Sequence, residues 1–443
     1  MNVLPGGTTE SDPTADSDPT TDLFATADSP RSADPRRTTD SDVQAGSGGQ
    51  AGSGADLVRL ARIALGHAVE PGNRDLGELV NRVGPVGALR DLRAGRVPER
   101  LREVATVRLG PVDPYRLAEV ALERADRLGA RILTPEDTEW PRQLDDLVGI
   151  SRHVADPIHR DTYPPQCVWV RGPWPLAEAC QRSVAVVGAR ASTSYGEHVA
   201  GDLGYGLADR GWTVVSGGAF GIDAAAHRGA LAAGGCTIAV LACGIDRPYP
   251  LSHTNLFERI CEVGLLFSEW PPGSDPHRRR FLIRNRVIAA ATRGTVVVEA
   301  NTRSGARFTL SRARLLGRAV LAVPGPVTSV MSSGCHEELR IEGSILVTGV
   351  PHVVEAVGRI GEDLAPVPRA DETPEDRLTP LQRQILDGVR PRKLRSAEEV
   401  AAAVGTSERD ARRVLPSLVE LGFVVAHGAG YRLSRKSDPK PPT

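Results

Sequence analysis

The stretch "SVAVVGARASTSYGEHVAGDLGYGLADRGWTVVSGGAFGIDAAAH", residues 183–227, decides the fold. A β-branched run ends at Gly188, a segment with helical spacing follows, and a second β-branched run ends at Gly217 and Gly218. Short apolar runs that alternate with helical segments are typical of parallel strands joined by crossover helices. The stretch therefore predicts the first units of an α/β sheet.

Further runs of the same kind continue this pattern along the chain. They are "TIAVLA" (237–242), "LLFSE" (265–269), "TVVVEA" (295–300), "AVLAVPG" (319–325) and "ILVTG" (345–349). Together the runs predict a doubly wound, parallel α/β sheet over residues 183–360, covered by helices on both faces. Ligands of open parallel sheets bind beyond the carboxyl ends of the strands, so the residues that follow each strand are the first site candidates.

The chain before this sheet divides into segments of different composition. Residues 1–54 hold nine acids against three arginines and end in "AGSGGQAGSG", which predicts a disordered acidic tail. Residues 55–130 carry apolar positions at helical spacing, broken by glycine and proline, and predict a small helical domain. Residues 131–182 are expected to connect that domain to the sheet.

The chain after the sheet begins with an acidic, proline-rich linker, residues 361–376. Three short helices and a hairpin are expected in residues 377–435, an order that predicts a winged helix, and residues 436–443 are expected to be a disordered tail. Pro416 lies inside the third helix and is expected to kink it, because proline lacks the N–H group that a helix interior uses.

Composition places the protein among ordinary globular chains, with 40% hydrophobic residues, 25% charged residues and a formal net charge of −1. Its six cysteines form no CxxC pair, which favours reduced thiols and predicts neither a disulfide frame nor a metal site. No basic stretch followed by an apolar core opens the chain, and no run of about 18 apolar residues occurs. We therefore expect a cytoplasmic protein that does not cross a membrane.

Three strand ends are rich in glycine, serine and arginine, which suits anion binding. Free N–H groups at helix starts bind phosphate oxygens well, since glycine lets a ligand approach the backbone closely. The candidates are Gly188, Arg190, Ser216, Gly217, Gly218, Arg303, Ser304 and Gly305. Alternatively, these residues only end strands and cap helices. Neither GxGxxG after the first strand nor GxxxxGK followed by Ser or Thr occurs, so the usual dinucleotide or ATP site is disfavoured and no cofactor is expected.

The stretch "SEWPPGSDPHRRRFLIRNRVIAAA", residues 268–291, places the basic loop "HRRR" before an alanine-rich helix that is expected to begin at Phe281. Arg278 and Phe281 belong to a composition that binds single-stranded nucleic acid, with guanidinium groups on phosphates and the ring under a base. The alternative is a solvated arginine cluster with Phe281 in the core. The next polar residues are either site residues or internal struts: Arg284, Asn285 and Arg286.

Candidates for acid–base chemistry are sparse. Asp223 and His227 are spaced i, i+4, and on one helix face they could pair. Glu299 lies at the end of a predicted strand and is a further candidate acid or base. Because no nucleophile or third ligand accompanies them, we interpret the pair as structural and predict no catalysis.

Taken in order, the motifs of residues 183–350 resemble those of the bacterial DNA-processing protein A family (DprA, also called Smf). The matching motifs are "VVGAR", "SGGAFGIDAAAH", "GIDRPYP", "SEWPPG", "FLIRNRVIAA", "AVPGPV" and "SSGCH". The resemblance implies an extended Rossmann-like domain between a SAM-like helical domain and a winged helix. It implies a homodimer that binds single-stranded DNA, protects it and helps to load the RecA recombinase during natural transformation.

Carried over by motif, the resemblance implies DNA contacts at Gly188, Arg190, Gly218, Arg278 and Phe281. Members of the family often have lysine where this chain has Arg278, a change that keeps the charge and alters the geometry.

Two rival functions stay open. A nucleotide-binding enzyme or sensor that resembles cytokinin-activating phosphoribohydrolases fits the glycine-rich strand ends, although "EANTRSGA" stands where those enzymes have "PGGxGT". A sequence-specific regulator would act through the third helix of the winged helix. Arg409, Arg412 and Arg413 favour that role, and Pro416 opposes it.

Overall fold

A computed structural model describes residues 54–153, 161–359, 363–365 and 373–435. Apart from Gly54, the predicted acidic tail lies outside the described residues, as do much of the predicted linker and the tail of residues 436–443. Within the described ranges, no helix is both long enough and apolar enough to cross a membrane.

The centre of the protein is a sheet with the strand order β1-β2-β6-β5-β4-β3-β7-β8-β9. All seven predicted strands are present, and each pairs in parallel with its neighbours among them. They are β3 (Ser183–Val187), β4 (Thr213–Ser216), β5 (Thr237–Val240), β6 (Leu265–Ser268), β7 (Gly294–Val297), β8 (Ala319–Ala322) and β9 (Ser344–Leu346). The chain builds outward from β3 through β4, β5 and β6, then returns to the other side of β3 with β7. The strand order therefore reverses between β3 and β7.

The segment expected only to connect two domains also contributes to the sheet. Strands β1 (Ala130–Leu133) and β2 (Val168–Arg171) extend it in antiparallel fashion beyond β6, with Trp169 opposite Ser268. The apolar run of β2 is buried on both faces, because Val168 and Val170 join one core and Trp169 joins another. Burial of these side chains explains why the run forms a strand and not a surface connection.

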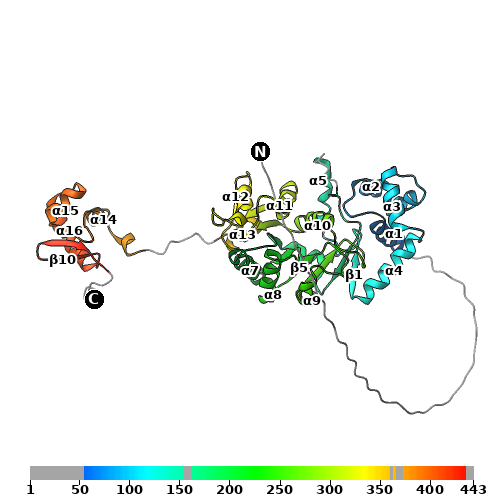
Figure 1. Ribbon diagram of the computed structural model, residues 1–443, viewed down its shortest axis with the longest axis horizontal. Coiled ribbons are helices and arrows are strands. Elements are labelled where there is room, and N and C mark those ends of the chain that lie inside the picture. Colours follow the sequence, from blue (N-terminus) through cyan, green and yellow to red (C-terminus); the bar gives the residue numbers. More distant parts are fainter. Residues whose placement is uncertain (1–53, 154–160, 360–362, 366–372, 436–443) are drawn as a thin grey trace, which may run out of the picture. The chain divides into compact units, whose positions relative to one another are not determined.

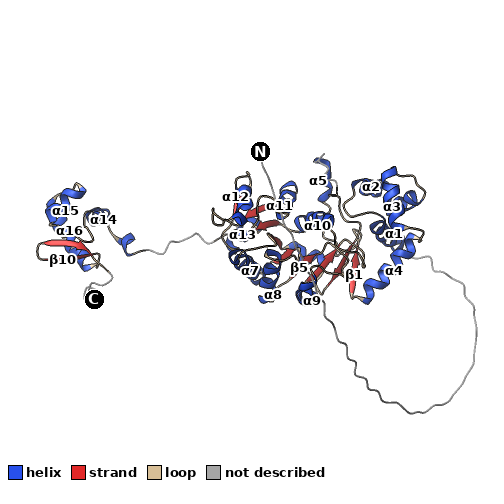
Figure 2. Cartoon of the chain, viewed as in Figure 1, coloured by secondary structure: helices blue, strands red, loops and turns tan. Residues whose placement is uncertain are grey.

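Helices cover both faces of the sheet (Figures 1 and 2). Ala185 and Val187 face one core with α10 and α11, whereas Val184 and Val186 face the other with α7, α8 and α13, as the two-residue repeat of a strand requires. The helices between β1 and residue 357 are α5 (Leu147–His153), α6 (Leu176–Gln181), α7 (Ser194–Asp209), α8 (Ile222–Ala232), α9 (Thr254–Val263), α10 (Arg278–Ala291), α11 (Ala306–Leu315), α12 (Ser333–Leu339) and α13 (Val350–Val357).

Four helices precede the sheet: α1 (Gly54–Ala68), α2 (Arg74–Arg93), α3 (Glu99–Leu109) and α4 (Pro114–Arg127). Helix α2 is interrupted at Gly84, whose φ of 72° is open to glycine, and Pro85 follows. Apolar side chains of these helices share one core with α9 and with Ile132, Trp169 and Leu266 of the sheet. The amino-terminal helices are thus packed on the β1-β2-β6 side of the α/β sheet.

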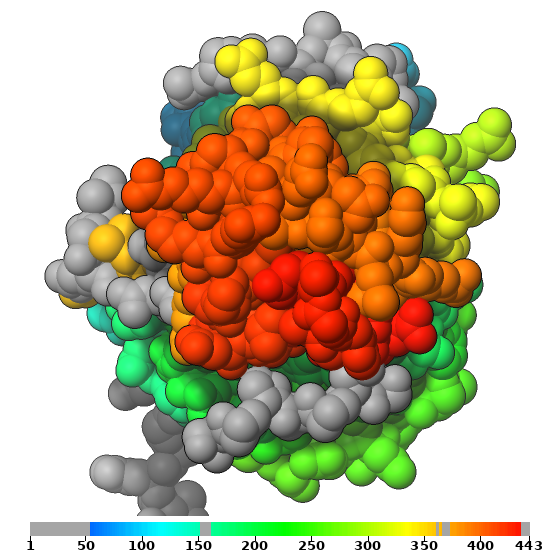
Figure 3. Space-filling view, turned by 90° about the vertical axis from the view of Figure 1, so that its left-hand side faces the viewer, coloured from blue at the N-terminus to red at the C-terminus, as the bar shows by residue number. Residues whose placement is uncertain are grey.

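Three helices and a hairpin form the carboxyl-terminal segment, drawn from orange to red in Figure 3. They are α14 (Pro380–Asp387), α15 (Ala397–Val404), α16 (Glu408–Glu420), β10 (Val424–His427) and β11 (Gly430–Leu433). Ile385, Val400 and Leu415 lie in their shared core. A kink was predicted at Pro416. Helix α16 nevertheless continues through this residue to Glu420. Burial of the flanking Leu415 and Leu418 holds the helix together despite the missing N–H.

Candidate nucleic-acid interface

A cavity of about 750 Å³ opens at the carboxyl edge of the sheet, beside the point where the strand order reverses. Residues that follow β3, β4 and β7 line it, together with the first turns of α10 and α11. Its predicted site residues are Gly188, Arg190, Arg278, Phe281, Arg284, Asn285, Arg303, Ser304 and Gly305. The parallel sheet thus brings together side chains that lie more than 100 residues apart in the sequence. Whether they contact DNA stays a prediction.

The three consecutive arginines belong to α10, which begins at Arg278 and not at Phe281 as expected. Cations at a helix start oppose the helix dipole, so the arrangement is locally unfavourable. Arg279 pairs with Asp161 at 2.5 Å and Arg280 with Glu70 at 2.6 Å. Arg278 is exposed at the cavity, and no described carboxylate or other polar group pairs with its side chain. One cation is thus left for an external anion.

The ring of Phe281 is half-buried, and Arg190 covers one of its faces. The guanidinium carbon of Arg190 lies 4.9 Å from the ring centroid, and the ring of Tyr249 meets it edge-on at 5.9 Å. The ring also packs against a small cluster that contains Trp270 and Ile283. Phe281 therefore contributes to the core and also lines the cavity, and its stacking on a base stays a prediction.

The start of α11 supplies the remaining basic side of the cavity. The Asn301 side chain accepts a hydrogen bond from the N–H group of Arg303 at 2.9 Å, which shapes the turn. The Asn285 side chain donates to the carbonyl oxygen of Gly305 at 3.4 Å. The side chain of Arg303 is exposed and has no acidic partner among the described residues. The Arg303 guanidinium suits a phosphate, whereas the backbone N–H groups of Arg303, Ser304 and Ala306 already donate within the turn.

Arg284 forms the floor of the cavity and is 4% exposed. Its guanidinium donates to the carbonyl oxygen of Val240, and its Nε atom has no partner among the described residues. Burial lowers the pKa of Arg284 to about 10, an effect that the Asp223 carboxylate opposes, so the side chain stays charged at neutral pH. A Cβ at Gly217 would lie 2.0 Å from this guanidinium, so Gly217 makes room for Arg284.

The predicted anion nest at the end of β4 is already filled from within the protein. Asp223 accepts hydrogen bonds from the N–H groups of Gly217 at 3.1 Å and Ala219 at 3.4 Å. Burial raises the pKa of Asp223, while Arg284 and these N–H groups act in the opposite direction. The Ser216 hydroxyl is buried and donates to the backbone of β3 at 2.6 Å. Neither Ser216 nor Gly217 lines the cavity, which corrects the nest proposed for them.

Gly218 is also turned away from the cavity. It is buried with a φ of 68°, and a Cβ there would lie 2.5 Å from the ring of Phe257. Its carbonyl oxygen lies 3.0 Å from Nδ1 of His253. This packing gives Gly218 a structural role, and the DNA contact predicted for it stays a prediction.

Glu299 fills the start of α7 in the same way. Its carboxylate accepts hydrogen bonds from the N–H group of Thr193 at 2.8 Å and from the Thr193 hydroxyl at 2.6 Å. A Cβ at Gly196 would lie 2.2 Å from this carboxylate, so glycine is required for the close approach. Glu299 therefore serves as an internal cap of α7.

Two further candidate residues, Arg286 and His227, are fully buried. Arg286 is fully buried and pairs with Glu269 while donating to the carbonyl oxygen of Tyr163 at 2.7 Å, so it is an internal strut and not a DNA contact. His227 lies 2.7 Å from the Thr237 hydroxyl and does not pair with Asp223. Burial lowers the pKa of His227 to about 3, so it is neutral in the folded protein.

Some residues of the site were not predicted from the sequence. Tyr249, in the motif "GIDRPYP", lines the cavity and could have been chosen as a second aromatic residue. Glu70 and Asp161, the partners of two arginines of α10, lie in segments with no recognisable motif. Only the folded chain brings them to that helix.

The fold and site define a Rossmann-like α/β protein with a basic cavity at its sheet edge. The sequence matches the family model described as DNA recombination-mediator protein A over residues 131–358. A Mycobacterium tuberculosis protein that carries the name DNA processing protein DprA is 44% identical to this chain over 371 residues. The match covers 84% of this chain and 93% of that protein. DNA processing protein DprA of Streptococcus pneumoniae is 44% identical over 165 residues, or 37% of this chain and 58% of that protein.

An X-ray structure of DprA from Streptococcus pneumoniae has a TM-score of 0.55 and 29% sequence identity, and the match covers 68% of this chain and 98% of that chain. The chain belongs to the DprA/Smf family.

Proposed function

We propose that the protein binds single-stranded DNA through this cavity. The observation that carries the proposal is that Arg190, Arg278 and Arg303, none with an acidic partner among the described residues, line the same cavity as the half-buried ring of Phe281. Guanidinium groups neutralise phosphates, and an aromatic ring offers a base a stacking surface that every base can use. Duplex DNA keeps its bases stacked inside, so the arrangement favours single strands.

We further propose that the protein acts in the cytoplasm as a homodimer, protects incoming single strands and helps to load RecA in natural transformation or recombination. The support is membership of a family whose model is described as a recombination mediator and whose members are named as DNA processing proteins. The proposal assigns no catalytic reaction to the cavity. The carboxyl-terminal helices and hairpin are proposed to be a winged helix, and residues 55–130 a SAM-like helical domain.

A titration with labelled oligo-dT, a duplex of equal length and several salt concentrations tests the central proposal. We expect tight binding of oligo-dT, far weaker binding of the duplex, and a steep loss of affinity with salt as bound cations are released. Equal affinity for both DNAs, or binding that does not respond to salt, would contradict the proposal.

A nucleotide-binding enzyme or sensor is the second candidate, because a cavity of about 750 Å³ at the strand-order reversal has the size of a small-ligand site. Against it, Asp223 and Glu299 already occupy two of the helix starts that would hold phosphate. A regulator that reads DNA with α16 stays the third candidate, because Arg412 and Arg413 are exposed and pair with Glu408 and Asp410 of the same helix only in weak surface ion pairs.

A further inference from the structure

We infer that Glu70, in the amino-terminal helical segment, is a positioning residue for the DNA site: it holds Arg280 and thereby directs Arg278 to the cavity. The inference rests on the proposed function. It assigns to the helices before the sheet a part in DNA binding, although none of their residues lines the cavity.

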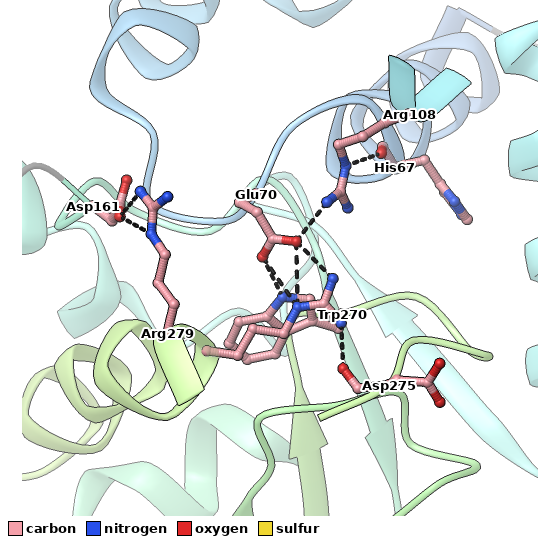
Figure 4. Close-up of polar contacts among 8 residues, drawn as sticks. His67, Glu70, Arg108, Asp161, Trp270, Asp275 and Arg279 are labelled. Atoms are coloured by element: carbon pink, nitrogen blue, oxygen red, sulfur yellow. Dashed lines mark hydrogen bonds and ion pairs between the residues drawn. The ribbon is translucent and has the colours of Figure 1, made fainter. Parts of the chain in front are cut away.

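Glu70 follows α1 and is the centre of a network that joins distant parts of the chain (Figure 4). Its carboxylate accepts hydrogen bonds from the indole N–H of Trp270 at 2.8 Å and from Arg280 at 2.6 Å. Arg108 of α3 donates to the same carboxylate at 2.5 Å. One acid thus joins α1 and α3 to the loop after β6 and to the first turn of α10.

The position of Arg280 on the helix explains how Glu70 acts on Arg278. Side chains two residues apart on an α-helix point about 200° away from each other, so fixing Arg280 toward Glu70 turns Arg278 to the opposite side. Arg280 also donates to the carbonyl oxygen of Asp275 at 2.7 Å, which ties the loop to the helix start. Asp161 holds Arg279 in the same manner.

Charge makes this arrangement stable. Burial would raise the pKa of Glu70, but hydrogen bonds from Arg280 and Trp270 and the charge of Arg108 lower it to about 2, so the carboxylate is ionised at neutral pH. The side chain of Arg280 is only 9% exposed. Without the carboxylate, Arg280 would be a nearly buried cation at a helix start, where the dipole opposes it, and the first turn of α10 would rearrange.

A double-mutant cycle in the full chain tests the inference with Glu70→Gln, Arg278→Ala and the double variant, each titrated with oligo-dT at several salt concentrations. Glutamine keeps the shape and an acceptor for Trp270 but removes the charge. We expect Glu70→Gln to weaken binding about fivefold. We expect the double variant to bind within about twofold of Arg278→Ala, because both changes remove the same contact. The salt slope should fall by about one in all three variants.

Glu136→Gln is the control, since Glu136 is likewise an acid paired with an arginine, Arg62 of α1, but lies away from the cavity. It should bind as the unmodified protein does. If Glu70→Gln does not fold, Arg280→Lys takes its place in the cycle. Lysine keeps the charge but cannot donate to Glu70 with two nitrogens of one planar group, as Arg280 does.

Unchanged binding by folded Glu70→Gln, or a loss that adds fully to that of Arg278→Ala, would overturn the positioning role while the DNA site stands. Unchanged binding by Arg278→Ala would instead overturn the proposed DNA contact itself. The two failures are thus distinguishable.

Discussion

The carboxylate of Asp223 accepts a hydrogen bond from the backbone N–H group of Gly217 at 3.1 Å. The glycine loop after β4, which resembles a phosphate-binding loop in sequence, therefore already holds an anion that belongs to the protein. Glu299 holds the start of α7 in the same way through Thr193. An external phosphate can therefore pair only with the exposed arginines that line the cavity, Arg190, Arg278 and Arg303. Several separate cations suit a strand that carries many phosphates.

Nucleoside monophosphates should bind weakly and should not be hydrolysed. Two helix starts are closed by internal carboxylates, and a single phosphate meets only part of the arginine set. Calorimetry with AMP and detection of released ribose phosphate check this. Saturable binding below about 0.1 mM, equivalent to more than about 5 kcal/mol, would favour the nucleotide-binding alternative.

Arg190→Ala and Arg278→Ala should each weaken oligo-dT binding in a folded protein. Each removes one unpaired cation at the cavity, so the slope of log affinity against log salt should become shallower by about one. Arg259→Ala is the control, because Arg259 is exposed on α9 outside the cavity. A folded Arg190→Ala protein with the original affinity would show that this side of the cavity does not meet DNA.

Phe281 should contribute to both stability and binding, as its half-buried ring indicates. Phe281→Leu keeps much of the apolar contact and should lower stability by less than about 1.5 kcal/mol. It should nevertheless weaken binding by about 1–3 kcal/mol, because leucine offers no stacking surface. Urea denaturation and oligo-dT titration measure the two effects. Phe281→Trp should retain binding, and a leucine variant with full affinity would limit the ring to a core role.

Arg286→Ala should lower the free energy of unfolding by about 3–5 kcal/mol, because it leaves the buried Glu269 carboxylate without its partner. The paired change Arg286→Met with Glu269→Leu should recover much of that loss, since both charges are then removed. Chemical denaturation measures both variants. A stable Arg286→Ala protein that has lost DNA binding would restore the predicted contact.

His227 should make the protein less stable in acid. Burial holds its pKa at about 3 in the folded state, against 6.5 when unfolded, so the unfolded state takes up the proton first. Stability should therefore fall as the pH drops from about 6.5 toward 3, by up to about 1.4 kcal/mol per pH unit from this group. His227→Gln should flatten that dependence in urea denaturation series, whereas His198→Gln, at an exposed position, should leave it as it is.

The parallel sheet and much of the cavity follow from local sequence. The inner strands β3, β4, β5 and β7 are short runs with β-branched residues, buried on both faces, and such runs are recognisable without knowing their neighbours. Parallel strands end at one edge, so Gly188 after β3 and Arg303 after β7 meet there by topology alone. The sequence of α10 likewise places Arg278 and Phe281 one turn apart.

Only the tertiary structure decided which charges are free. Arg278 and Arg280 are indistinguishable in "HRRR", yet one lines the cavity and the other is bound to Glu70, 210 residues away. Arg286 follows Arg284 by two positions and forms a buried ion pair with Glu269. The glycine loops look open in sequence until Asp223 and Glu299 are seen to fill them. An ion pair depends on which distant group the fold brings within a few ångströms, and no local pattern encodes that distance.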